Sequence, residues 1–284
     1  MSESQAEEKV APGAPPRAQF RLAHLLWWLP LCLVHGTAVA WIAYGVQKNF
    51  APLGLFPILI GLGLGVTLAG LMRLVQVANR TTILLGLIVA CTAAVAGQHY
   101  FSYREQRETA IRQAAEFRIA AEAHPGLVQG SPPQPASGLV EYLRWQAIRG
   151  RPIWGDVIAR RGMAWVSWAV DACLVFAAAL AVVVPASRQP FCNQCRTWFS
   201  TVRRGRFSAS AGENLAAALG SDVSGDIQEG TYRIVDCQGG CGIAGFEICW
   251  ELAEGGSNVK RVWVSREDRA KLDELLAPVS QAKA

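Results

Sequence analysis

Charged residues are scarce in this 284-residue chain, where they make up 17% of the sequence while hydrophobic residues make up 51%. A typical soluble protein carries about 25% charged residues. The deficit is concentrated in long apolar blocks, which favours membrane spans over one large soluble core. An ordinary soluble globular protein is therefore not the expected class.

The C-terminal third lacks a basic excess. From residue 188 to 284, twelve Lys and Arg residues balance twelve Asp and Glu residues. A neutral domain argues against a nucleic-acid partner, because phosphate binding needs a basic face. The chain also lacks a serine–histidine–acid set, a P-loop and a Gly-x-Gly-x-x-Gly sequence after a strand. We therefore do not expect an enzyme, with one exception that the cysteines raise.

Four apolar segments are long enough to cross a bilayer. They comprise residues 20–44, 52–77, 81–98 and 163–186. We predict a membrane α-helical bundle of four transmembrane helices and a small α+β soluble domain. The predicted domains are a disordered tail at 1–19, three spans within 20–99, a loop at 100–162, a fourth span at 163–187 and the soluble domain at 188–284. A cleaved signal peptide is the alternative for the first segment, since Ala38 and Ala40 could flank a cleavage site.

Small residues recur at four-residue spacing in three of the segments, and such a ridge lets a second helix approach closely. The three ridges are Gly61, Gly65 and Ala69; Gly86, Ala90 and Ala94; and Ala169, Cys173, Ala177 and Ala181. They predict a compact bundle. The alternative is that Gly and Ala are simply common in membrane helices.

The loop at residues 100–162 has two amphipathic parts. Residues 103–124 are rich in Ala, Glu, Arg and Gln, which are good helix formers, and a Pro/Gly/Ser stretch at 125–138 ends them. The second part, residues 139–158, combines Arg, Trp and Ile. That composition predicts a helix in the membrane interface, or else one that packs on the loop's first helix.

The distribution of arginine predicts which ends of the helices are cytoplasmic. Arginines flank the start of the first segment, the turn after the second and the end of the fourth: Arg17, Arg21, Arg73, Arg80, Arg188, Arg196, Arg203, Arg204 and Arg206. With four spans, all three arginine-rich positions lie on the same side of the membrane. This places both termini in the cytoplasm and the spans in a cell (inner) membrane. Arg149, Arg151, Arg160 and Arg161 disagree, because they would then lie outside beside the fourth span.

The cysteines fall into two groups. Cys32, Cys91 and Cys173 lie in apolar segments, where cysteine usually acts as a small hydrophobe. In the soluble domain, Cys192 and Cys195 form one close pair, and Cys237 and Cys241 form a second. Two such pairs supply the four tetrahedral sulfur ligands of a structural zinc site. Cys249 is left over, and in an alternating strand it is expected to pack against neighbouring side chains.

Residues 188–280 resemble a zinc ribbon, because Cys192-x-x-Cys195 and Cys237-x-x-x-Cys241 match its two knuckles. The resemblance implies zinc ligation by these four cysteines. The surrounding sequence fits a ribbon, with strands predicted at 231–236, 244–252 and 259–264. The chain departs from the pattern by a 41-residue gap between the pairs and by one extra residue in the second pair. We expect a helix at 212–219 within the gap, and a terminal helix after a capping box that begins at Ser265.

Three other roles for the cysteines can be compared with zinc. A haem c site needs histidine after the second cysteine, but Arg196 stands there. A membrane thiol–disulfide oxidoreductase could use Cys192 and Cys195, but it needs an outer cysteine pair and residues 100–162 contain no cysteine. Disulfides would require an oxidising compartment, against the predicted topology.

Two polar residues lie inside predicted spans. A charged residue there is costly and is a functional candidate by default. Asp171 in the fourth segment and His35 in the first are expected at similar depths, so they could form a pair. The alternative is a protonated Asp171 bonded to Ser167, Thr92 or a backbone carbonyl.

These observations lead to three hypotheses for function. The first is an integral membrane protein, without enzymatic activity, that anchors a cytoplasmic zinc-binding module for a protein partner. The second is a small transporter or channel-like bundle that uses Asp171 and His35. The third is the thiol–disulfide oxidoreductase that uses Cys192 and Cys195.

Overall fold

The computed structural model describes residues 22–47, 54–124, 130–154, 157–208, 227–241, 243–252, 257–264 and 269–270. The contacts divide the chain into two compact units, with the boundary between Ser187 and Arg188. The first unit is helical and the second is built on an antiparallel sheet.

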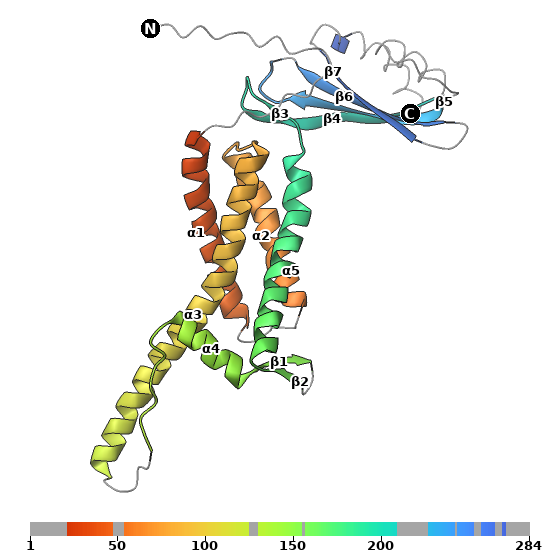
Figure 1. The fold of residues 1–284 in the computed structure, drawn as a ribbon. Helices are drawn as coiled ribbons and strands as arrows, with labels where there is room; N and C mark the ends of the chain where they lie inside the picture. Colours follow the sequence, from red (N-terminus) through yellow and green to blue (C-terminus); the bar gives the residue numbers. More distant parts are fainter. Residues whose placement is uncertain are drawn as a thin grey trace, which may run out of the picture. The chain divides into compact units, whose positions relative to one another are not determined.

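Four long helices form the first unit (Figure 1). They are α1 (Leu22–Gln47), α2 (Leu55–Leu74), α3 (Arg80–Ala123) and α5 (Gly162–Ser187). All four are long and apolar enough to cross a membrane. Successive long helices run in opposite directions, so the start of α1 and the end of α5 lie at the same end of the unit.

The bundle consists of two closely packed pairs, α1 with α3 and α2 with α5. Glycine allows both helix pairs to approach closely, because a larger residue would clash. A Cβ atom at Gly36 would lie 2.3 Å from the Ala90 carbonyl oxygen, and a Cβ atom at Gly61 would lie 2.4 Å from the Val175 carbonyl oxygen. The predicted ridges on α2 and α3 therefore contribute to helix packing. The ridge predicted on α5 does not, because its four residues are exposed: Ala169, Cys173, Ala177 and Ala181.

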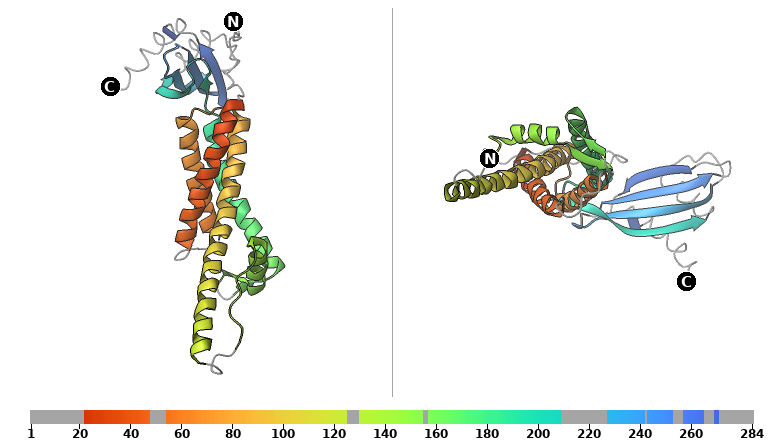
Figure 2. Two further views of the ribbon diagram at one scale, coloured as in Figure 1. Left: turned by 90° about the vertical axis from the view of Figure 1, so that its left-hand side faces the viewer. Right: turned by 90° about the horizontal axis from the view of Figure 1, so that it is seen from below.

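The third apolar segment and the first part of the predicted loop form one continuous helix. α3 has 44 residues, and Asn79 caps its start by accepting a hydrogen bond from the Thr82 N–H at 3.1 Å. About 20 residues suffice to cross a bilayer, so α3 extends well beyond its neighbours, as Figure 2 shows. The helix expected from residue 103 is therefore confirmed, and it continues from the third apolar segment without a break.

A short helix and a hairpin follow α3, where one amphipathic helix was predicted. α4 (Leu139–Arg149) stops at Gly150, whose φ of 93° ends the helical conformation. β1 (Arg151–Trp154) and β2 (Val157–Ala159) then pair antiparallel. Tyr142 of α4 is buried and its ring centroid lies 5.8 Å from that of Tyr103 on α3. α4 therefore packs on the extended part of α3.

The second unit is a five-stranded antiparallel sheet in the order β3-β4-β5-β6-β7. Its strands are β3 (Phe191–Cys192), β4 (Thr197–Ser208), β5 (Ile227–Cys237), β6 (Ala244–Leu252) and β7 (Ser257–Val264). The last three contain the three strands predicted from the sequence. The helix predicted at 212–219 and the capping box at Ser265 lie outside the described residues.

Candidate metal centre

The first cysteine pair is held by the tight turn between β3 and β4. Cys192 ends β3 and pairs with Thr197, which begins β4, so Cys195 lies within the turn. Arg196 has a φ of 53°, in the left-handed region that reverses the chain after Cys195. The turn thus brings both thiols of the pair to the same end of the sheet.

The second pair lies at the neighbouring connection, between β5 and β6. Cys237 ends β5 directly opposite Phe199 of β4, and the Gly240 N–H donates a hydrogen bond to the Cys237 carbonyl at 3.2 Å. Gly240 has a φ of 75°, a conformation that glycine adopts without strain. The close approach of the two turns also needs glycine, because a Cβ atom at Gly239 would overlap Cys195.

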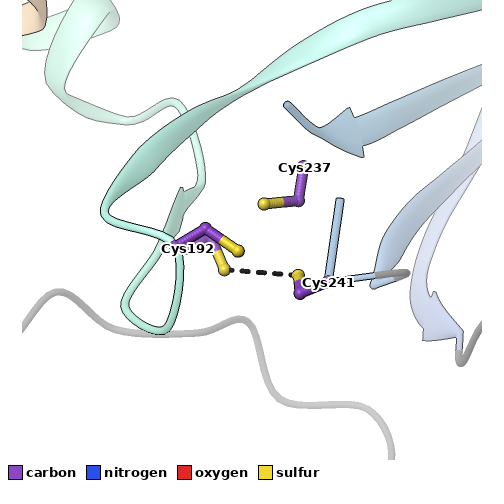
Figure 3. A group of neighbouring side chains, drawn as sticks. Cys192, Cys237 and Cys241 are labelled. Carbon is purple, nitrogen blue, oxygen red and sulfur yellow. Dashed lines mark hydrogen bonds between the residues drawn. The ribbon is translucent and has the colours of Figure 1, made fainter. Parts of the chain in front are cut away.

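The four thiols converge on one point. The sulfur atoms of Cys192, Cys195, Cys237 and Cys241 all lie within 4.8 Å of one another, and those of Cys192 and Cys241 are 3.6 Å apart. Figure 3 shows the sulfurs of Cys192, Cys237 and Cys241 directed toward one another. Four sulfurs at about 2.3 Å from a tetrahedral ion are about 3.8 Å apart, and a disulfide needs about 2.05 Å. The arrangement therefore fits a metal ion, and all four cysteines are free.

The thiols differ in their ease of ionisation. Burial raises the pKa of Cys237, but hydrogen bonds from the Thr197 hydroxyl and the Gly239 N–H outweigh burial and lower the pKa to about 7. Burial raises the pKa of Cys241 to about 12. Since metals bind the thiolate, Cys237 is deprotonated more easily than Cys241, and Thr197 is a neighbour that supports the Cys237 thiolate.

The centre is walled by apolar side chains. Phe199 and Val235 are buried against Cys192 and Cys237, and Ile243 and Trp263 pack beside them. The rings of Phe199 and Trp263 meet edge to face, with centroids 5.0 Å apart. Four cysteine ligands within such a shell leave no open coordination position, which is typical of a structural and not a catalytic site.

The predicted pair of Asp171 and His35 is wrong, because each residue has another partner. Asp171 Oδ2 lies 2.5 Å from Nη1 of Arg151, the first residue of β1. His35 Nε2 lies 2.8 Å from the Thr67 hydroxyl of α2. The ion pair also replaces the alternative of a protonated Asp171 that bonds only to neutral groups. Arg151 was one of the four arginines that disagreed with the topology rule, and that disagreement was the available signal that it has a partner in the helical unit.

No known protein family, curated protein or solved structure matches this chain. The chemistry of the chain therefore has to be inferred from its own residues. Four cysteines gathered from two turns are the clearest cluster of ligand atoms in the described part of the chain.

Proposed function

We propose that this chain is an integral membrane protein whose four long helices span a bilayer and anchor a cytoplasmic zinc-binding module. The observation that carries the proposal is the convergence of four thiols within 4.8 Å in a closed, apolar setting. Zinc is the metal favoured by four tetrahedral thiolates in a structural site. Such an ion stabilises a small sheet unit whose own core is modest.

The proposed topology rests on the number and direction of the helices. Four antiparallel spans bring the start of α1, the α2–α3 turn and the end of α5 to one side. These are the positions where arginine is enriched, as is typical of cytoplasmic ends. A cytoplasmic location is reducing, which keeps the four cysteines available for zinc.

A row of charges across the sheet supports a protein partner. The strand register places Arg204, Arg233, Glu247 and Arg261 side by side on β4, β5, β6 and β7. Arg261 pairs with Glu247 at 2.5 Å. Arg204 and Arg233 directly oppose each other, and like charges in that position destabilise a sheet. An acidic segment of a partner protein would relieve this repulsion.

Nucleic acid fits the same face less well. Single strands bind through exposed aromatic rings as well as basic side chains. On this face Phe199 is buried and Trp263 packs on it, so neither ring is free to stack on a base. Glu247 also interrupts the row of arginines. We therefore propose that the arginine row binds an acidic protein segment.

The metal is tested on the full chain, purified in detergent under reducing conditions and analysed for metal by mass spectrometry. We expect about one zinc per chain, lost in the Cys192→Ser/Cys237→Ser double variant. Cys249→Ser is the matched control, because Cys249 lies in the same sheet but outside the cluster. Little metal together with a disulfide would instead favour the thiol–disulfide oxidoreductase that uses Cys192 and Cys195.

The partner surface is tested with a fluorescent glutamate-rich peptide. Arg204→Gln/Arg233→Gln should weaken its binding by about tenfold and reduce its dependence on salt. Arg112→Gln/Arg118→Gln on α3 is the control of equal charge change. Equal weakening in both variants would show only a general charge effect.

A transporter that uses Asp171 together with His35 has less support, because the two side chains bond to different partners.

A further inference from the structure

A cavity of about 320 Å³ lies within the helical unit, where α3 and α5 meet α4 and the start of β1. Its wall contains both polar and apolar side chains. The polar side chains are Gln47, Gln98, His99, Ser102, Gln146, Arg151 and Asp171. The main apolar ones are Phe56, Ile60, Val95, Trp168 and Val175. This size is within the range of small-molecule sites, and an amphiphile would match both kinds of side chain.

The charges in the wall cancel. Arg151 and Asp171 are the charged lining residues, and they bond to each other at 2.5 Å. Their side chains are 26% and 20% exposed, so solvent screens the pair only in part. Because the two charges cancel, the wall offers no net opposite charge to a charged ligand. The site therefore favours an uncharged ligand.

One wall residue needs a hydrogen-bond donor. The Oε1 atom of Gln146 is buried and has no hydrogen-bond partner among the described residues. A buried acceptor without a donor costs free energy. Because this oxygen is not accessible from the cavity, a ligand can supply the donor only after the Gln146 amide rotates toward it. Around it, the Gln98 amide, the His99 ring and the Ser102 hydroxyl offer groups that can donate or accept. A hydroxyl group both donates and accepts, which suits this mixture.

We propose that the cavity binds the uncharged, hydroxyl-bearing head group of an amphiphile, with the Gln146 amide rotated so that one hydroxyl donates to its Oε1. The apolar part of the molecule lies against Phe56, Ile60 and Val175. A carboxylate can accept several hydrogen bonds, so Asp171 can accept a second hydroxyl while it remains paired with Arg151. The site belongs to the helical unit and does not depend on the metal centre.

The probe is 1-monooleoylglycerol, added to the full chain in a detergent without hydroxyl groups, such as dodecyldimethylamine oxide. Binding is counted by native mass spectrometry. Three matched probes define the chemistry: methyl oleate has the chain without hydroxyls, free glycerol has hydroxyls without the chain, and oleate carries a charge. We expect monooleoylglycerol to bind at least about tenfold more tightly than each of them, which corresponds to one good hydrogen bond or a lost apolar contact.

Variants connect that binding to the cavity. Gln146→Leu should weaken the binding of monooleoylglycerol by about tenfold. Gln106→Leu is the matched control, because Gln106 Oε1 is also buried without a partner but Gln106 does not line the cavity. Ala172→Leu fills part of the cavity without removing a polar group, and it should also weaken the binding of monooleoylglycerol. The proposal can therefore be tested even if Gln146→Leu does not fold. Equal binding of methyl oleate, or unchanged binding in both Gln146→Leu and Ala172→Leu, overturns the proposal. Equal binding of free glycerol overturns the amphiphile and indicates a soluble polyol.

Discussion

Gly239 and Cys195 lie so close together that a Cβ atom at Gly239 would be 2.2 Å from Cys195 Cβ and 2.7 Å from Cys195 Sγ. The two residues belong to different turns, far apart in the sequence. Their contact brings the second cysteine pair onto the first, so the size of one glycine decides whether four sulfurs can share one ion.

Replacing Gly239 by alanine should therefore weaken metal binding more than a surface change would. The added methyl group must push the two turns apart, and a misplaced ligand costs about 10–100-fold in metal affinity. The measurement is competition of the purified chain with a zinc chelator. Gln238→Ala is the control, because Gln238 is an exposed neighbour in the same turn. Equal affinities in the two variants would contradict the importance of this contact.

A second prediction concerns the pairing of α2 and α5. Gly61→Val should destabilise the helical unit by about 1–3 kcal/mol, because an overpacked interface has to separate. Gly63→Val is two residues away on the same helix, and nothing lies within 4 Å of a Cβ atom at that position. We expect the control to change stability by less than about 0.5 kcal/mol. Thermal unfolding in detergent compares them, and similar losses would mean that α2 does not pack on α5 through Gly61.

The ion pair of Arg151 and Asp171 can be separated from His35 by double-mutant cycles. Asp171→Asn and Arg151→Gln should each destabilise the chain. The cycle of these two variants should give a coupling free energy of about 1–2 kcal/mol, which is smaller than for a fully buried ion pair because both side chains are partly exposed. The cycle of Asp171→Asn with His35→Ala should couple by less than about 0.5 kcal/mol. A large coupling in the second cycle and none in the first would restore the pairing expected from the sequence.

The start of α4 should show a local dependence on pH. The Ser137 hydroxyl and backbone N–H both donate to Glu141 Oε2 and hold the pKa of Glu141 below its usual 4.5. A lowered folded-state pKa contributes stability above the unfolded value, and that contribution is lost as the pH falls through the folded value. Ser137→Ala should raise the pKa of Glu141 toward 4.5. Carbon NMR of labelled glutamate measures it, with Glu108 as the reference residue, and an unchanged pKa would rule out the hydroxyl contribution.

Local patterns predicted the sheet well. Alternating apolar residues gave β6 with its observed bounds, and the cysteine spacing predicted a cluster that the turns do assemble. Both signals are short in range, since a strand and a knuckle are each defined by a few neighbouring residues.

The features that were mispredicted depend on contacts between distant residues. The partner of Asp171 is Arg151, which comes from the loop before α5, and the only signal for it was the conflict of that arginine with the topology rule. The small residues at Ala169 and Ala177 had the right spacing for packing, but α2 contacts the face that contains Val175 and Ala178 instead. The apolar segment that ends near Gln98 and the helix formers from residue 103 were both predicted, but not that they form one continuous helix to Ala123.

The continuity of α3 makes it a stiff rod. At 1.5 Å per residue its 44 residues measure about 66 Å, and no proline or turn interrupts them to act as a joint. A twist applied near Ala123 is therefore carried along the axis to Ala90, which faces Gly36 of α1. The two ends of this helix cannot be moved independently, so the tip and the α1–α3 contact behave as one mechanical element.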